Sequence, residues 1–269
     1  MPHMRVGDVE LNYELVDCTE PWKAGPPPVV FVHGLGGTGA MWLYQIPAFC
    51  DRFPTITLDL RGHGASTKPE RDFTVADMAR DIVRLLRSLG VERAHLVGLS
   101  LGGMVIEQFA IDYPLAVASL VLVDTLCGVP PEFQDTMRAA MQFIEQHSMA
   151  EVAKARITNA FSDGVDPSTR DYFIDQVAVN DKAAYERAAR AAFGFSVGTR
   201  LGEISAPTLV VVGDHDRVTP PLLSEEIAAR IPAARLARLA GAGHISNIEK
   251  PAEFNRVVLD FLTTVEQSR

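Results

Sequence analysis

The sequence has few cysteines, no excess of positive charge and no long apolar run. Its 269 residues include three cysteines, none in a C-x-x-C pair, which excludes a disulfide framework and gives no support for a structural zinc site. The formal charge of −9 argues against a nucleic-acid partner and against an anionic membrane surface. No segment is apolar for long enough to span a bilayer, and residues 1–6 lack the apolar run of a signal peptide. We therefore expect a cytoplasmic protein with reduced thiols.

Short apolar runs alternate with helical periodicity in the first half of the chain. We expect an opening hairpin over residues 6–16 and buried strands over residues 29–32, 55–58, 94–97 and 119–123. Between them we expect helices over residues 41–53, 74–89 and 104–111. This alternation predicts an α/β protein with a parallel sheet and helices on both faces.

The alternation stops between residues 127 and 202. Helices are expected there over residues 133–146, 149–160, 168–178 and 182–193. The pattern then resumes with strands over 208–212 and 234–239 and helices over 223–230 and 252–265. We therefore predict a core made of residues 1–126 and 203–269 and a helical cap, residues 127–202. The cap is expected over the carboxyl edge of the sheet, where ligands bind in open α/β folds.

The segment GLSLGG at residues 98–103 carries the clearest chemical signal. It holds a G-x-S-x-G motif between an expected buried strand and an expected helix, a context in which the motif presents a nucleophilic serine. Glycines at 98 and 102 leave room for the sharp turn, so that the Ser100 hydroxyl projects outward. The N–H of Leu101, at the helix start, would point at a developing oxyanion. Ser100 is therefore the candidate nucleophile.

A serine hydroxyl needs a base to take its proton, and the base needs an acid to orient it. His244 is the candidate base, because it follows the last expected strand and its flanking glycines let a loop aim the imidazole at the sheet edge. Asp216, three residues beyond the strand-ending Gly213, is the favoured acid. Asp214 and Asp124 remain alternatives.

A glycine-rich segment after an early strand allows two interpretations. The N–H of Leu35 can supply the second half of an oxyanion hole, with His33 supporting the loop. Residues 34–39 also spell G-x-G-x-x-G, and Asp59 follows about 20 residues further on, as in a dinucleotide-binding fingerprint. The dinucleotide hypothesis is disfavoured because a hairpin precedes this strand and because it leaves the serine, aspartate and histidine signals unexplained.

Five motifs in a fixed order make the chain resemble the α/β-hydrolase superfamily over nearly its full length. They are His33-Gly34, the segment DLRGHGAS at residues 59–66, GLSLGG at residues 98–103, residues 213–216 and Gly243-His244. The resemblance implies the α/β-hydrolase fold, with a mostly parallel eight-stranded sheet and a helical cap. It also implies Ser100 as nucleophile, Asp216 as acid and His244 as base, with no cofactor and no metal.

Residues 98–104 and 244–251 are also similar to hydrolases of the 3-oxoadipate enol-lactonase kind, which open small enol-lactones that carry a carboxylate. This similarity implies a small ester or lactone as the substrate. The expected cap offers candidate carboxylate partners, although a solvated surface suffices for any one of them: Arg138, Arg156, Arg170, Arg187 and Arg190. Three alternatives stay open, namely a carbon–carbon bond hydrolase of this fold, a non-enzymatic ligand receptor on this fold and an NAD-dependent dehydrogenase.

Overall fold

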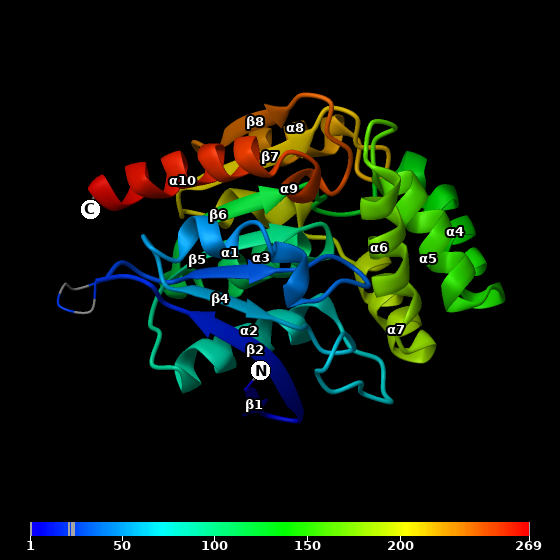
Figure 1. Ribbon diagram of the computed structural model, residues 1–269, viewed down its shortest axis with the longest axis horizontal. Coiled ribbons are helices and arrows are strands. Elements are labelled where there is room, and N and C mark those ends of the chain that lie inside the picture. Colours follow the sequence, from blue (N-terminus) through cyan, green and yellow to red (C-terminus); the bar gives the residue numbers. More distant parts are fainter. Residues whose placement is uncertain (1, 21, 23–24, 269) are drawn as a thin grey trace.

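The computed structural model describes residues 2–20, 22 and 25–268, and an eight-stranded sheet runs through this part of the chain (Figure 1). The strand order is β1-β2-β4-β3-β5-β6-β7-β8, with β1 His3–Val6, β2 Val9–Val16, β3 Val29–Val32, β4 Thr55–Leu58, β5 Ala94–Leu99, β6 Val117–Val123, β7 Thr208–Gly213 and β8 Arg235–Leu239. The pairs β1–β2 and β2–β4 are antiparallel, and the remaining neighbours are parallel. The predicted mostly parallel, eight-stranded sheet is confirmed.

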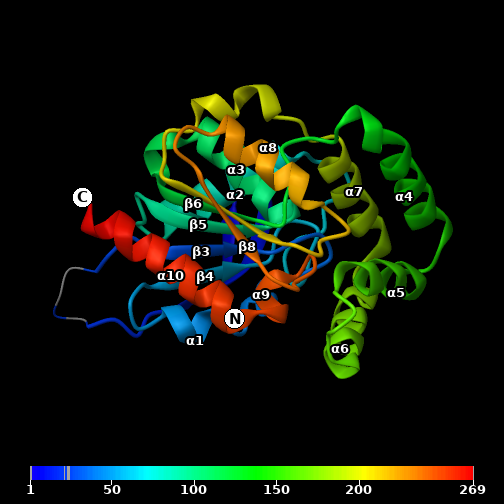
Figure 2. The same cartoon turned by 90° about the horizontal axis from the view of Figure 1, so that it is seen from above.

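Helices cover both faces of the sheet, which explains why its central strands are buried along their whole length and mostly apolar. Every residue of β3, β5, β6 and β7 is buried. Figure 2 shows one helix layer above the sheet, made of α2 (Val75–Ser88), α3 (Leu101–Asp112) and α8 (Pro221–Arg230). The layer below it holds α1 (Ile46–Phe49), α9 (Ser246–Glu249) and α10 (Pro251–Gln267).

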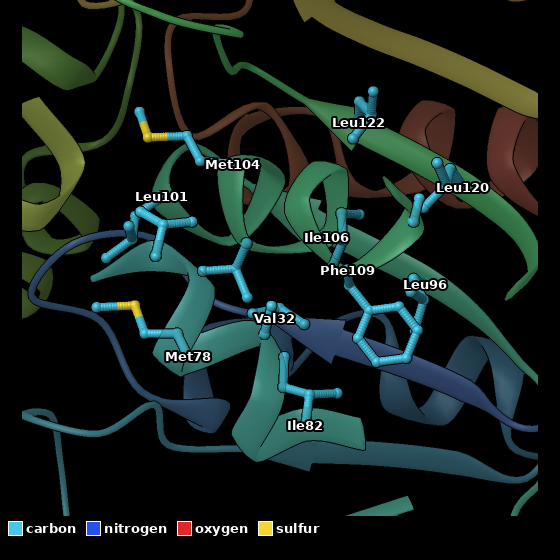
Figure 3. Close-up of a cluster of buried hydrophobic side chains, with 14 of the residues drawn as sticks. Val32, Met78, Ile82, Leu96, Leu101, Met104, Ile106, Phe109, Leu120 and Leu122 are labelled. Atoms are coloured by element: carbon cyan, nitrogen blue, oxygen red, sulfur yellow. The ribbon is translucent and has the colours of Figure 1, made fainter. Parts of the chain in front are cut away.

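The core between the sheet and the α2/α3 layer is built from large aliphatic and aromatic side chains. Figure 3 shows Val32, Leu96 and Leu120 of the strands facing Ile82 of α2 and Phe109 of α3. Burying each such side chain contributes about 1.5–3 kcal/mol relative to leaving it exposed. This packing fixes the start of α3 against the carboxyl ends of β3 and β5.

Four consecutive helices follow β6 and precede β7. They are α4 (Gln134–Gln146), α5 (Met149–Ala160), α6 (Pro167–Ala178) and α7 (Lys182–Phe193), and we call them the insert helices. In both views they lie together beyond the arrowheads of the parallel strands (Figures 1 and 2). The four predicted helices are therefore present. A 3-10 helix, Gly198–Glu203, crosses the predicted boundary at residue 202, and the division into core and cap stays a prediction.

The predicted helix over residues 41–53 is wrong. The structure has a 3-10 turn, η1 (Gly39–Trp42), followed by the short helix α1. Pro47 explains the break, because proline has no N–H to donate and its ring clashes with the carbonyl four residues earlier. It is accepted here in the first turn of α1. The short α9 was also missed. Among the described residues, no helix has the length and apolar character of a membrane span. The cytoplasmic location stays a prediction.

Candidate active site

Ser100 occupies a strained turn between β5 and α3. Its backbone has φ 55° and ψ −116°, a left-handed conformation that costs a non-glycine residue about 1–3 kcal/mol. Two hydrogen bonds to residues outside α3 help to hold it there. The Ser100 N–H donates to the Val123 carbonyl at 2.9 Å, and the Ser100 carbonyl accepts from Thr125 Oγ1 at 2.7 Å. Because the backbone is fixed by its neighbours, the turn presents Ser100 at the carboxyl edge of the sheet.

Gly98 and Gly102 are required by the close approach of backbones around this turn. A Cβ at position 98 would lie 2.4 Å from the Gly102 carbonyl oxygen. A Cβ at position 102 would lie 2.1 Å from the carbonyl oxygen of Val32. No side chain fits at either distance, so the glycines of the G-x-S-x-G motif are needed for its geometry.

His244 lies on the loop after β8 and is hydrogen-bonded to Asp216. Its Nδ1 is 2.9 Å from Asp216 Oδ2. The other oxygen of Asp216 accepts from the N–H groups of Val218 and Thr219, and Thr219 Oγ1 donates to Oδ2. The carboxylate is therefore held by several donors. Because it bonds to Nδ1 of the imidazole, Nε2 is the ring nitrogen that can act on a substrate.

Burial and charge set the protonation of this pair. Burial disfavours the imidazolium, but the Asp216 carboxylate outweighs it, so the pKa of His244 is raised above its ordinary value. Burial would raise the pKa of Asp216, yet the charge of His244 and the hydrogen bonds from Thr219 hold it below its ordinary value. The arrangement therefore favours a charged imidazolium beside a carboxylate, which a serine mechanism needs in its transition state.

The two alternative acids are hydrogen-bonded to groups other than the imidazole. Asp124 accepts from the Gly213 N–H at 2.8 Å and from Ser246 Oγ at 2.6 Å. Burial, reinforced by the charge of Asp216, raises the pKa of Asp124 to about 8. Asp214 is exposed and accepts from the Gly241 N–H. Of the three candidates, the structure brings Asp216 to the imidazole.

Ser100 and His244 open onto the same cavity, which has a volume of about 280 Å³. Leu35 also lines it, within a turn closed by a 3.0 Å hydrogen bond from the Gly37 N–H to the Gly34 carbonyl. Leu101 is the first residue of α3, so its N–H has no carbonyl partner within the helix. The rest of the wall comes largely from apolar residues of the insert helices: Met137, Ala140, Ala155, Ile157, Phe173 and Val177.

The glycine-rich segment, residues 34–39, is held by hydrogen bonds within the protein. Asp59 accepts hydrogen bonds from the N–H groups of Gly39 and Ala65 at 2.9 and 2.8 Å. His33 is fully buried and accepts from the Leu60 N–H, as expected of a residue that supports the loop. In a dinucleotide site, Asp59 would bind a ribose hydroxyl and the glycines would open a long helix. Here the glycines lead into the four-residue turn η1.

Sequence reasoning missed Glu249, the last residue of α9. Its Oε1 accepts from the Gly243 N–H at 2.9 Å, and its Oε2 accepts from the Ser162 N–H at 3.2 Å. The His244 N–H donates to the Ala160 carbonyl at 2.7 Å. The loop that carries His244, residues 240–245, is here called the histidine loop, and it is therefore joined to the end of α5 at two points. No local pattern signals this, because the partners are about 85 residues apart along the chain.

Comparison with known proteins gives the class of this protein. Residues 29–257 match the Alpha/beta hydrolase family, so the chain belongs to that family of hydrolases. It is 28% identical over 254 residues to 3-oxoadipate enol-lactonase 2 of Acinetobacter baylyi, which covers 93% of this chain and 92% of that protein.

Two further proteins show the range of relatives. RutD of Variovorax paradoxus, which carries the provisional name carbamate hydrolase, is 32% identical over 246 residues, covering 88% of this chain and 92% of RutD. The crystal structure of the enol-lactonase from Burkholderia xenovorans LB400 superposes with a TM-score of 0.90 at 28% identity, covering 97% of this chain and all of that one. The predicted family and fold are confirmed.

Proposed function

We propose that the protein is a serine hydrolase that cleaves a small carboxylic ester or lactone through an acyl-enzyme. The observation that carries this proposal is the meeting of Ser100 and His244 at one cavity, with Asp216 hydrogen-bonded to the far side of the imidazole. A nucleophile, a base and an orienting acid are the three parts that acyl transfer to serine requires.

In the first half-reaction, His244 takes the proton of the Ser100 hydroxyl as the oxygen attacks the carbonyl carbon. The N–H groups of Leu35 and Leu101 stabilise the oxyanion of the tetrahedral intermediate. Asp216 keeps the imidazole proton on Nδ1 and stabilises the imidazolium. The imidazolium then gives its proton to the leaving alkoxide, and the acyl-enzyme remains on Ser100.

The second half-reaction repeats these roles with water as the nucleophile. His244 takes a proton from water, which attacks the acyl-enzyme carbonyl. The new tetrahedral intermediate collapses, its C–O bond to Ser100 breaks, and the serine oxygen recovers a proton from the imidazolium. The carboxylic acid product then leaves. For a lactone, the alcohol and the acid belong to one molecule, so both leave together.

Two observations support a small ester or lactone. The cavity of about 280 Å³ lies just below the usual range of about 300–1,000 Å³ for small-molecule sites, and its wall is mostly apolar. The relatives named above include two enol-lactonases.

The first test is hydrolysis of a short-acyl 4-nitrophenyl ester by the wild type and by Ser100→Ala. We expect the wild type to release 4-nitrophenolate steadily and the variant to retain about 10⁻³ of the rate or less, because the nucleophile is gone. Ser205→Ala, a substitution at an exposed serine, serves as the control. Equal rates for wild type and Ser100→Ala would contradict the mechanism.

A substrate panel separates the remaining alternatives. Esters and lactones are compared with a carbamate and with a dienoic diketone whose carbon–carbon bond is the target. Fastest turnover of the diketone would favour a carbon–carbon hydrolase. Tight binding of one ligand without turnover of any ester would favour a receptor. Tight binding of NAD would favour the dehydrogenase.

A further inference from the structure

The insert helices pack directly on residues 34–37, which we call the oxyanion turn. Its third residue, Gly36, has φ 77°, a left-handed conformation that favours glycine at this position of a turn. A Cβ at Gly36 would lie 2.8 Å from Tyr185 Cε2 on α7 and 3.2 Å from Val177 Cγ1 on α6. The oxyanion turn is therefore in contact with two insert helices, and all four of its residues line the cavity.

Asn180, in the connection between α6 and α7, adds a polar contact to this packing. Its side-chain Nδ2 donates to the Gly36 carbonyl at 2.9 Å and to the Val177 carbonyl at 2.9 Å. Because both neighbours are carbonyl oxygens, they accept from the NH2 end of the amide, which has two hydrogens to donate. The side chain of Asn180 therefore joins the last turn of α6 to the oxyanion turn.

This contact reaches the Leu35 N–H through two peptide groups. Each group is planar, and its carbonyl and N–H point in opposite directions, since the described chain has no cis peptide bond. Asn180 holds the carbonyl of the group between Gly36 and Gly37, and the N–H of that group donates to the Gly34 carbonyl at 3.0 Å. The Gly34 carbonyl belongs to the same group as the Leu35 N–H. Fixing the first plane therefore helps to fix the direction of the oxyanion donor.

The Gly34 carbonyl is also held from the side of the sheet. His33 Nδ1 lies 2.8 Å from it, and His33 Nε2 accepts from the Leu60 N–H at 2.9 Å, so the proton of the neutral ring is on Nδ1 and is donated to Gly34. Burial lowers the pKa of His33, which keeps the ring neutral. Among the described residues, nothing accepts from the Leu35 N–H. This donor is therefore oriented by its neighbours and left for a ligand.

We propose that Asn180 is a positioning residue through which the insert helices set the direction of the Leu35 N–H in the oxyanion hole. This inference rests on the proposed function, because an oxyanion forms only if Ser100 attacks a carbonyl. The two halves of the hole then have different supports. The Leu101 N–H is fixed by the start of α3 in the core, whereas the Leu35 N–H depends in part on a residue of the insert 144 positions away from Gly36.

The test uses two substitutions at Asn180 and one matched control. Asn180→Asp keeps the size of the side chain but puts an acceptor oxygen against the Gly36 carbonyl. Asn180→Ala removes the donor without adding a charge. Gln142→Glu makes the same amide-to-carboxylate change at an exposed residue of α4. The values of kcat and KM for 4-nitrophenyl acetate and 4-nitrophenyl butyrate are measured in the wild type and the three variants.

We expect kcat to fall while KM stays nearly constant, because the donor interacts most strongly with the oxyanion and both half-reactions form one. Loss of a whole oxyanion donor costs about 10²- to 10³-fold in kcat, so a misdirected one should cost roughly 10- to 100-fold in Asn180→Asp and roughly threefold to tenfold in Asn180→Ala. KM should change less than about threefold, and Gln142→Glu should keep the wild-type values.

Three results would overturn the positioning role and leave the proposed hydrolase intact. They are an unchanged kcat in both Asn180 variants, a rise in KM at constant kcat, and a loss of kcat in Asn180→Asp alone. The last result would mark an effect of the added charge, since Asn180→Ala removes the same hydrogen bonds.

Amide proton exchange, followed by nuclear magnetic resonance, separates failure of this inference from failure of the proposed function. The Gly37 N–H is bonded within the oxyanion turn, so its exchange rate reports the order of the turn without a substrate. The Met104 N–H, which donates to the Ser100 carbonyl at 3.1 Å, reports the core beside it. If the wild type hydrolyses neither ester, the proposed function fails, and exchange alone decides about Asn180.

Faster exchange at Gly37 in both Asn180 variants, with wild-type exchange at Met104 and in Gln142→Glu, would support control of the oxyanion turn by Asn180. Exchange at Gly37 equal to that of the wild type, or an equal increase at Gly37 and Met104, would overturn it, because the side chain would then act on the whole fold or not at all.

Discussion

Two aspartates lie close to His244, and their environments give them different protonation states. Asp216 is hydrogen-bonded to the imidazole and has a lowered pKa, whereas burial raises the pKa of Asp124 to about 8. At neutral pH, Asp216 is therefore ionised and Asp124 carries a proton for most of the time. The sequence places all three candidates after strands and favours Asp216, but it leaves the other two open, because the choice depends on which side chain reaches the imidazole across the sheet edge.

The first prediction separates the two aspartates by the pH dependence of kcat/KM. Asp216→Asn should lower kcat roughly 10⁴-fold, since the amide cannot hold the productive tautomer. Asp124→Asn should lower kcat less than about tenfold, because it replaces a largely neutral group with a neutral one.

In the wild type, the neutral imidazole is the base and its pKa is raised, so activity should fall as pH drops through a value above the ordinary 6.5. Residual activity of Asp216→Asn should have its acid limb at lower pH.

The assignment fails if Asp124→Asn is inactive while Asp216→Asn turns over normally. Near-ultraviolet circular dichroism of both variants checks that each keeps the folded core.

At the scale of elements, the sequence predicted a helix correctly where the spacing of apolar residues alone determined its bounds. The insert helices and α10 were predicted to within about two residues because apolar spacing sets a helix and its breakers end it. The 41–53 prediction failed because Pro47 competes with an apolar pattern that otherwise reads as helical. The contact of Glu249 with the histidine loop and α5 is a tertiary arrangement, and no spacing rule encodes it.

The second prediction concerns that contact. Glu249→Ala removes the acceptor of the Gly243 and Ser162 N–H groups, so that only the His244–Ala160 hydrogen bond still joins the histidine loop to the end of α5. We expect kcat to fall roughly 10- to 100-fold with a smaller change in KM, since small misplacement of a catalytic group is costly. Glu249→Gln keeps an amide oxygen in place and should retain activity within about threefold. Burst kinetics with a 4-nitrophenyl ester report the acylation step directly.

Glu253→Ala, a carboxylate in the first turn of α10, is the matched control for this series. If Glu249→Ala loses thermal stability and its KM rises while kcat is unchanged, Glu249 is a packing residue, and its proposed role in positioning His244 is wrong.

At the scale of the whole molecule, one carboxyl group in the core takes no part in the proposed reaction. Glu107 on α3 is fully buried, and both of its oxygens are without a hydrogen-bond partner among the described residues. Burial raises its pKa well above the ordinary value. The folded protein therefore holds a proton that the unfolded chain releases near its ordinary pKa.

The third prediction follows from that proton. Stability from a raised acid pKa is present at low pH and is lost as pH rises from the ordinary value toward the raised one. The wild type should lose up to about 1.4 kcal/mol of unfolding free energy per pH unit in this window relative to Glu107→Gln. Urea unfolding of both proteins at pH 5.5 and 7.5 measures the difference. Asp124 titrates in both, so its contribution cancels, and parallel pH dependence in the two proteins would contradict the prediction.

The chain leaves the sheet at β6, forms the insert helices and returns to the sheet at β7, which is the neighbouring strand. β6 and β7 pair directly, from Leu120 with Thr208 to Val123 with Val211, although the whole insert separates them along the chain. The entropic cost of closing such a connection grows only slowly with its length. Insertions and deletions among these helices can therefore accumulate while the strands keep their register. In this architecture, the insert helices that line the cavity can change without a change in the turn that carries Ser100, so proteins with the same sheet can come to bind different molecules.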